Sequence, residues 1–369
     1  MNSFLEKKKT LESYYEKIST EPIGTQRNKK YAIRNFSDFV RETYDGRTIL
    51  NVIDELNIIK TTGQEKYEDS LYETIQKWIN WNESKGIGNY TIRTVFSNLR
   101  KYLFFLGIKT HEQEIKEYLR FGKVPKEERH PLSQQEFRAI VDGFSRNPWY
   151  QALFLTLGHS GMRIGEALSL KKKDLDISVS RIKVNIPADT KTRRGRSTFL
   201  SKEVEAKLKP RLEEIGLDDY IFCKSTPPTA LSNVKRALLR LLQKLGLDEK
   251  YQSNGFSKIT SHSFRAYFFT KAARKHGENY AHRMTGHGGY LMQYDRMTED
   301  EKLEMYLQLE PDLIIYDQTR NEIEIEKLRR ENQSIEDLRE EVKRLREQQV
   351  NSDKKILDKL RNGGIIPSL

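Results

Sequence analysis

The sequence predicts a mainly α-helical protein with a small antiparallel sheet in its second half. Apolar residues recur at helical spacing through the first third of the chain and through most of the remainder. Apolar and polar residues alternate at 181–186, as in a strand. Beyond residue 321 Glu, Lys, Arg and Gln dominate, which predicts a separate charged helix. We therefore expect three parts, at 1–125, 126–316 and 317–369.

The charge of the chain indicates a polyanionic partner. The net charge is +12 and the isoelectric point is near 9.4. A basic balance of this size attracts nucleic acids or anionic membranes. The basic residues are spread along the chain and are not concentrated on one amphipathic helix, so we favour nucleic acid.

The remaining composition points to the cytoplasm. No apolar run approaches the ~18 residues of a transmembrane helix, and the N-terminus lacks the apolar region of a secretory signal. Cys223 is the only cysteine, which excludes a disulfide framework and a thiolate metal site. We expect a cytoplasmic protein that associates with nucleic acid.

The first part is predicted to be a small helical bundle. Four segments carry apolar residues at helical spacing: 8–19, 25–44, 66–84 and 92–106. The last of these has one continuous apolar stripe and ends at Gly107. Its polar face can contact phosphates and base edges if the helix enters a groove, although an ordinary solvated face has the same composition. The candidate DNA-binding residues on it are Arg93, Thr94, Ser97, Asn98 and Lys101.

A charged, proline-containing linker at 120–131 precedes the second part. Ser133 and Glu136 then form a capping-box pattern that opens a helix. A strand ending at Pro187, a basic loop at 190–196 and a return strand at 197–200 predict a hairpin. Further helices are expected at 149–157, 202–215, 230–246, 261–276 (capped by Ser261) and 299–309.

The candidate chemistry centres on His262 and Arg265, which are three residues apart and so share a helix face. An Arg, two His and a Tyr can bind a phosphate, move protons and attack phosphorus. The further candidates are Arg163, Glu166, Lys191, His287 and Tyr294, and the loop residues Arg193, Arg194 and Arg196 are candidate DNA contacts. We interpret His159, His276 and His282 as structural. His282 and His287 have a zinc-like spacing, but no Cys or carboxylate cluster accompanies them, so no metal is expected.

The order of these residues resembles the tyrosine recombinases, the phage integrase family. Residues 161–170 (GMRIGEALSL) resemble the first motif of that family, and His262-Ser-Phe-Arg265 resembles its H-x-x-R motif. Thr285-Gly-His287 resembles its L-G-H motif, and a Tyr follows within ten residues. Lys191 matches the β-hairpin lysine of the family. The resemblance spans roughly residues 1 to 310, with the motifs confined to 161–296.

Several positions depart from the family pattern. Thr285 stands where Leu is usual, and Ala266-Tyr267 stands where His-Thr is common. Tyr294 follows His287 at an interval of seven residues, where nine is common, and Tyr290 competes as nucleophile. We favour Tyr294 because the run at 294–301 looks like the Tyr-x-Arg and acidic helix of archaeal members. Tyr290 lies very close in sequence to His287.

The resemblance implies a SAM-like core-binding bundle followed by a recombinase catalytic domain, together forming a C-shaped clamp on duplex DNA. It implies cleavage and rejoining through a 3′-phosphotyrosine without a cofactor. Tyr294 would be the nucleophile and Lys191 the general acid. A homo-tetramer on paired sites, acting for a mobile element, is the implied assembly. The alternatives are a type IB topoisomerase-like enzyme and a catalytically inert DNA-binding relative.

The charged C-terminal segment has apolar residues at heptad positions. Leu328, Ile335, Leu338, Val342 and Leu345 fit positions a and d, and Gln349, Ser352 and Lys359 then break the seam. The pattern predicts a short coiled coil that supports oligomerisation. A single charged helix in solvent is the alternative.

Overall fold

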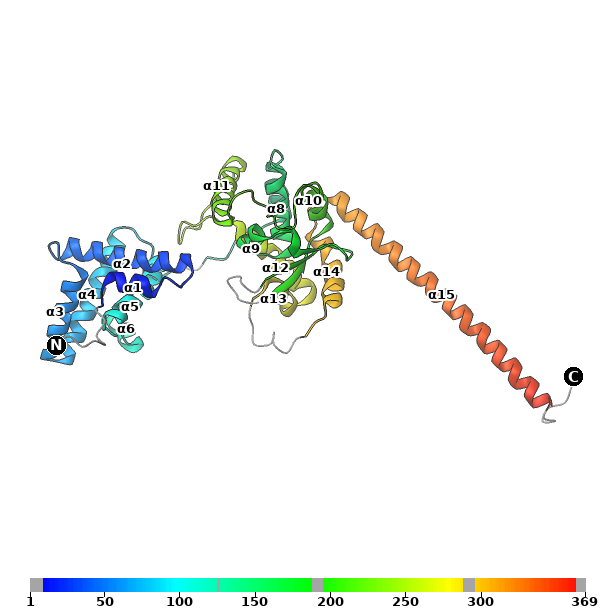
Figure 1. The fold of residues 1–369 in the computed structure, drawn as a ribbon, viewed down its shortest axis with the longest axis horizontal. Helices are drawn as coiled ribbons and strands as arrows, with labels where there is room; N and C mark the ends of the chain where they lie inside the picture. The colour runs from blue at the N-terminus through cyan, green and yellow to red at the C-terminus, as the bar shows by residue number, and fades with distance from the viewer. Residues whose placement is uncertain (1–8, 125–126, 188–194, 288–295, 363–369) are drawn as a thin grey trace. The chain divides into compact units, whose positions relative to one another are not determined.

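The computed structural model describes residues 9–124, 127–187, 195–287 and 296–362 (Figure 1). These residues form fifteen α-helices, one 3-10 helix and a three-stranded antiparallel sheet. The predicted mainly α fold is therefore confirmed. The chain divides into two compact units, residues 1–128 with 251–256, and residues 129–250 with 257–369. None of the described helices is both long and apolar enough to cross a membrane.

The first unit is a helical bundle around one apolar core. Its helices are α1 (Leu11–Lys17), α2 (Ile23–Thr43), α3 (Ile49–Thr62), α4 (Gln64–Ser84), α5 (Asn89–Leu106) and α6 (Glu112–Tyr118). Trp78 and Leu99 are fully buried in this core. Two helices, α3 and α6, were not expected. The sequence of α3 does carry the helical signal, because Ile49, Val52 and Ile53 bury one face of it.

The second unit wraps helices around the sheet. Its helices are α7 (Gln134–Gly143), α8 (Pro148–Ser160), α9 (Ile164–Ser169), α10 (Lys202–Glu214), α11 (Pro227–Leu245), α12 (Ser261–His276), α13 (Glu278–Thr285) and α14 (Glu299–Leu313). The 3-10 helix η1 spans Lys172–Asp174. Helix α12 packs against α8, α13 and α14, and β3 packs against α8, α13 and α14. The packed helices of this unit thus support α12 and β3, which carry His262, Arg265 and Arg196.

The sheet has the strand order β1 (Leu175–Asp176), β2 (Lys183–Ile186) and β3 (Arg196–Phe199). Val184 pairs with Thr198, and Ile186 pairs with Arg196. Val184 and Ile186 are buried and Asn185 is exposed, as the alternation predicts. The hairpin register brings Arg196 to the start of the return strand.

Helix boundaries follow local capping chemistry. The predicted capping box at the start of α7 is present, since Ser133 Oγ accepts the N–H of Glu136 and Glu136 accepts the N–H of Ser133. The expected cap of α12 was wrong by one residue. Thr260 has the extended N-cap backbone and its hydroxyl accepts the N–H of His262, so Ser261 is already helical.

The charged C-terminal segment is one continuous helix, α15 (Asp317–Asn362), as Figure 1 shows. Its first turns are attached to the second unit by ion pairs. Arg138 pairs with Asp317 at 3.1 Å, and Lys202 pairs with Glu326 at 2.8 Å. Ile323 is 6% exposed. From Lys327 to Asp353 every residue is exposed.

Candidate active site

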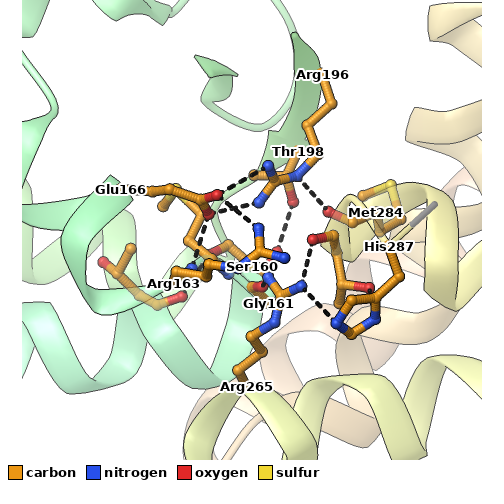
Figure 2. A network of polar contacts seen from close by, with 12 residues as sticks. Ser160, Gly161, Arg163, Glu166, Arg196, Thr198, Arg265, Met284 and His287 are labelled. Carbon is orange, nitrogen blue, oxygen red and sulfur yellow. Dashed lines mark hydrogen bonds and ion pairs between the residues drawn. The ribbon is translucent and has the colours of Figure 1, made fainter. Parts of the chain in front are cut away.

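Five polar side chains from four separate segments of the chain meet in the second unit (Figure 2). Arg163 is the N-cap of α9, and Glu166 lies in the first turn of that helix. Arg196 comes from β3 and Arg265 from α12. His287 follows the end of α13. The structure therefore brings together four of the predicted catalytic and supporting residues, and it adds Arg196 to them.

A glycine turn sets the approach of α8 to α9. Gly161 has φ +66°, in the left-handed region that favours glycine. A Cβ at this position would lie 2.5 Å from Phe268 and 2.8 Å from Thr285. The turn leaves the Gly161 carbonyl free to accept a hydrogen bond from Nη1 of Arg265. The glycine of the first motif therefore positions the arginine of the second.

Glu166 joins two of the arginines. Its Oε1 accepts from Nη1 of Arg163 at 2.8 Å, and its Oε2 accepts from Nη2 of Arg196 at 2.6 Å. Oε2 also accepts the backbone N–H of Arg163 at 2.8 Å, which caps α9. Burial alone would raise the pKa of Glu166, but hydrogen bonds and the charge of Arg196, together with Arg163, lower the pKa below its usual value. Glu166 is therefore a carboxylate at neutral pH.

Arg196 lies in a different place from the one the sequence suggested. We expected it in the basic loop as a DNA contact, yet its side chain is only 7% exposed. Besides Glu166, its Nε donates to the carbonyl oxygen of Met284 at 3.1 Å. A Cβ on Gly286 would lie 2.8 Å from Nη1 of Arg196, so the guanidinium group packs directly over that glycine. In this structure Arg196 ties the hairpin to α9 and α13.

Arg265 is the most buried cation of the site, with 2% of its surface exposed. Its Nη2 donates to the carbonyl oxygen of Thr285 and to Nε2 of His287, the latter at 3.2 Å. Burial and the charges of Arg163 and Arg196 lower the pKa of Arg265 to about 9, so it is still charged at neutral pH. Its Nε is buried and has no acceptor among the described residues. A buried donor in this state is costly unless a ligand supplies the acceptor.

The hydrogen bonds around His287 select one tautomer. The Thr285 hydroxyl donates to the carbonyl oxygen of Ala281 at 2.6 Å, so its oxygen is an acceptor toward Nδ1 of His287 at 3.3 Å. Nδ1 therefore carries the proton, and Nε2 presents its lone pair to Arg265. Desolvation and the charges of Arg265 and Arg163 lower the pKa of His287 to about 4. The ring is neutral at pH 7.

His262 lies in the first turn of α12 and remains exposed. Partial desolvation and the charges of Arg265 and Arg163 lower its pKa. The shared helix face that the sequence predicted thus has an inner member, Arg265, and an outer member, His262. Arg163 at the start of α9 and His262 and Arg265 on α12 therefore interact electrostatically.

Sequence comparison identifies the domain that carries these residues. Residues 130–288 match the phage integrase family. The second unit carries a phage integrase family domain. No curated protein is significantly similar to the chain in sequence.

Solved structures agree with this assignment at the level of the fold. A lambda integrase dimer bound to a COC′ core site is 17% identical with a TM-score of 0.52, over 78% of this chain and 79% of that chain. Lambda integrase residues 75–356 bound to DNA are 16% identical with a TM-score of 0.52, over 79% of this chain and 93% of that chain. A structure of XerA recombinase is 18% identical with a TM-score of 0.37, over 80% of this chain and 95% of that chain. The two lambda integrase structures with TM-scores of 0.52 show that the chain shares their fold.

Other predicted residues of the integrase domain lie outside the described residues. They are Lys191, Arg193, Arg194, the favoured nucleophile Tyr294 and its competitor Tyr290. Their roles stay predictions from the sequence. The described hairpin strands and Arg296 flank the two gaps.

The candidate DNA-binding residues of the first unit lie along one helix, α5. Arg93, Thr94, Ser97 and Lys101 are exposed, and Asn98 is half-buried. Arg93 stacks over the ring of Phe121 at 4.8 Å and donates to the carbonyl oxygen of Gly122 at 3.4 Å. Next to this face, a pocket of about 590 Å³ is lined by the basic side chains Lys17, Lys29, Arg100, Lys101 and Lys109.

The other histidines make structural contacts. His159 is fully buried, with Nδ1 2.6 Å from Oγ of Ser201, and burial lowers its pKa to about 3. Nε2 of His276 contacts the carbonyl oxygen of Met305 at 2.8 Å. Among the described residues no cluster of three or more His, Cys, Asp or Glu could hold a metal ion.

The sequence placed one residue of the site elsewhere and gave no role to another. Arg196 was expected in the basic loop as a DNA contact, and Thr285 was noted only as a departure from the family motif. The signal that could have placed Arg196 is the hairpin register, which pairs Arg196 with the buried Ile186 and so puts both on one face of the sheet. No pattern in the sequence announces that the Thr285 hydroxyl contacts His287.

Proposed function

We propose that this chain is a site-specific DNA recombinase that cleaves and rejoins duplex DNA through a 3′-phosphotyrosine intermediate. The observation that carries the proposal is that the charges of Arg163 and Arg265 act on each other beside a neutral His287 within a phage integrase domain. Three guanidinium groups face one carboxylate among the side chains in Figure 2. An excess of positive charge in a partly buried site favours a phosphate ligand.

The arginines would stabilise the phosphorane-like transition state. When a phenol attacks a phosphodiester, negative charge grows on the two non-bridging oxygens. Arg163 keeps donors that Glu166 does not use, and the Nε of Arg265 lacks an acceptor among the described residues. Donors fixed before substrate arrives lower the barrier because they need no reorganisation. Glu166 orients Arg163 and does not itself transfer a proton.

The histidines would handle protons. His262, neutral at pH 7 because its pKa is lowered, would accept the phenolic proton of the nucleophile. The entering phosphodiester is a monoanion, and its negative charge raises the pKa of nearby bases. His287 would then take up a proton from water at Nε2 and donate a hydrogen bond from it to a non-bridging oxygen, with Thr285 holding the opposite ring nitrogen.

The nucleophile and the acid come from the sequence. The Tyr294 oxygen would attack phosphorus, forming the 3′-phosphotyrosine bond as the bond to the 5′-oxygen breaks. Lys191 would protonate the departing 5′-oxygen. A 5′-hydroxyl of the exchanged strand would then attack the phosphotyrosine and release the tyrosine. The bond energy is conserved in the intermediate, so rejoining needs no ATP.

Duplex DNA is the proposed substrate, and the polar face of α5 is the proposed grip of the first unit. Binding should weaken steeply with salt because phosphate contacts release counterions. Strand exchange between two duplexes requires four cleavages, so the proposed active assembly is a homo-tetramer on paired sites. Integration or excision of a mobile element is the proposed biological reaction.

A nicked duplex tests the cleavage step. After cleavage the short fragment that ends at the nick diffuses away with its 5′-hydroxyl, so the strand cannot be rejoined and the intermediate is trapped. A denaturing gel then separates the protein–DNA adduct from free protein. The probe is a set of nicked duplexes tiled across the DNA that adjoins the coding region of the protein. We expect an adduct that is abolished by Tyr294→Phe and kept in Tyr290→Phe. The reverse result would move the nucleophile to Tyr290. If the parent protein itself forms no adduct, the proposal is overturned in favour of an inert DNA-binding protein.

A two-site plasmid separates strand exchange from relaxation. We expect products in which the segment between the two sites is inverted or excised, according to their orientation. Relaxed topoisomers of unchanged sequence order, formed equally on plasmids without a site, would instead identify a topoisomerase-like enzyme. Tyr294→Phe serves as the matched negative control in both assays.

A further inference from the structure

Helix α15 presents an apolar stripe that nothing in the described chain covers. Side chains along it are 47–57% exposed, although they are apolar residues in a highly charged helix. The stripe consists of Leu328, Ile335, Leu338, Val342 and Leu345. The same helix buries Ile323 against the second unit, so the exposed stripe begins where the intramolecular contact ends.

The residue types along the stripe indicate how many helices associate in the coiled coil. In heptad register, position a is occupied by Leu328, Ile335 and Val342, and position d by Leu338 and Leu345. β-Branched residues at a with Leu at d favour two parallel strands, because their side chains pack best in the holes of a parallel pair. The register continues through two full heptads at 335–348. Glu331, at d, weakens the preceding heptad.

The flanking charges specify the same orientation. Glu341 occupies position g, and Arg346 occupies the following position e. In a parallel pair, position g of one helix faces the next position e of the other, so Glu341 meets Arg346 of the second copy twice per dimer. In an antiparallel pair with the same core, residue 335 lies opposite 345. That arrangement sets Arg339 near Arg339 and Glu341 near Glu341 of the second copy.

We propose that α15 pairs with α15 of a second copy as a parallel, in-register, two-stranded coiled coil over residues 328–348. The second copy is the occupant because the stripe is complementary to itself in both shape and charge. The seam ends at Gln349 and Ser352, so the pairing is short and concentration-dependent. It strengthens when two copies are held close together on one ligand, since the second contact is then intramolecular. The pairing does not depend on the proposed strand cleavage.

Sedimentation equilibrium of the full chain without DNA tests the strand number. We expect a monomer–dimer equilibrium whose dissociation constant rises at least tenfold in Leu338→Gln. Glu347→Gln is the matched control, because it introduces the same residue at the outward-facing position f of the same helix. The control should lie within twofold of the parent. A chain that stays monomeric, a trimer or tetramer, or an unchanged dissociation constant in Leu338→Gln would overturn the proposal.

Disulfide trapping tests the orientation. Leu328→Cys and Val342→Cys, made separately, place one thiol at each of two a positions fourteen residues apart. Under mild oxidation both should form disulfide-linked dimers, because each residue meets its own copy only in a parallel, in-register pair. In an antiparallel pair at most one position can face itself, so cross-linking of only one variant, or of neither, would overturn the parallel arrangement. Glu340→Cys at position f and the parent, whose Cys223 is buried, should stay uncross-linked.

Discussion

The candidate active site and the polar face of α5 hold their polar groups in opposite ways. In the site, Glu166, Arg196 and Arg265 are buried, and each bonds to groups from other elements. On α5, by contrast, the hydroxyl of Thr94 donates to the carbonyl oxygen of Tyr90, and Asn98 donates to the carbonyl oxygen of Thr94. Those two bonds stay within one helix, whereas Arg93 also contacts Phe121 and Gly122 outside it. The site residues are fixed by tertiary structure, and most residues of the polar face of α5 are exposed and held only by their own helix.

The difference assigns the two regions different tasks. Groups held by several elements keep their geometry when substrate arrives, which is what transition-state stabilisation requires. Exposed groups on one helix adjust to a ligand surface and contribute through charge more than through geometry. Substitutions in the site should therefore change both stability and cleavage, whereas substitutions on α5 should change only affinity and its salt dependence.

The largest effect is expected for Arg265→Lys. An ammonium group cannot reach the Gly161 and Thr285 carbonyls and His287 together, so buried acceptors lose their donor. We expect cleavage to fall about 10³-fold and unfolding free energy to drop by about 3 kcal/mol, measured by adduct formation and denaturant unfolding. Arg274→Lys, at an exposed position of the same helix, should match the parent. If Arg265→Lys cleaved DNA and unfolded like the parent, the contrast between the site and the polar face of α5 would be lost.

Glu166→Gln should have the next largest effect. A neutral amide cannot balance Arg163 and Arg196, so both guanidinium groups lose their shared anchor. Cleavage should fall about 10²-fold because a positioned donor is displaced. Glu213→Gln, on an exposed stretch of α10, is the control. Cleavage at the parental rate in Glu166→Gln would show that the carboxylate is not needed to place Arg163.

Glu166 also predicts a pH dependence. Its pKa is lower in the folded chain than the ordinary value of 4.5. Its stabilisation is therefore fully present above about pH 4.5 and is lost as the pH falls through the lower folded value. Unfolding of Glu166→Gln, followed from pH 6 to pH 3, should lose less stability on acidification than unfolding of the parent. If the free energy of unfolding fell equally with pH in both proteins, the lowered pKa assigned to Glu166 would be contradicted.

A smaller effect is expected for Thr285→Val, which has nearly the same shape. Loss of the hydroxyl removes the acceptor for Nδ1 of His287 and so releases the ring tautomer. One hydrogen bond of about 1 kcal/mol corresponds to a roughly fivefold slower cleavage, with a shifted pH–rate profile. Thr270→Val, exposed on α12, is the matched control. A slower rate with an unchanged pH profile would indicate a packing defect instead of a positioning role.

The smallest effect is expected on α5. Lys101→Ala should weaken duplex binding evenly across sequences and reduce the slope of log affinity against log salt by about 0.9. Unfolding should be unchanged, because Lys101 is exposed. Lys66→Ala, exposed on α4, removes the same charge elsewhere in the unit and should leave the slope unchanged. Equal slopes for the two variants would remove α5 from the proposed DNA contact.

Local periodicity explains why much of the fold was predictable. The apolar stripe of α5, the capping box of α7 and the alternation of β2 each depend on neighbours within a few residues, and each was found as expected. Helix α3 was not expected, although its Ile49, Val52 and Ile53 share a buried face at helical spacing. The cap of α12 was misplaced by one residue because Thr260 and Ser261 are both good caps.

The amino-acid sequence alone determined the residue types of the site and their order along the chain, since these are covalent properties. It also determined the seam of α15, whose heptad spacing is local. Only the tertiary structure decided that Arg196 turns inward onto Glu166 and Gly286, and that Thr285 faces His287. The Arg196 contacts join elements far apart in sequence, and their geometry depends on how β3, α9 and α13 pack, whereas Thr285 and His287 are brought together by the left-handed turn at Gly286 that ends α13. A hydrogen bond between elements far apart in sequence leaves no periodic signal in the chain.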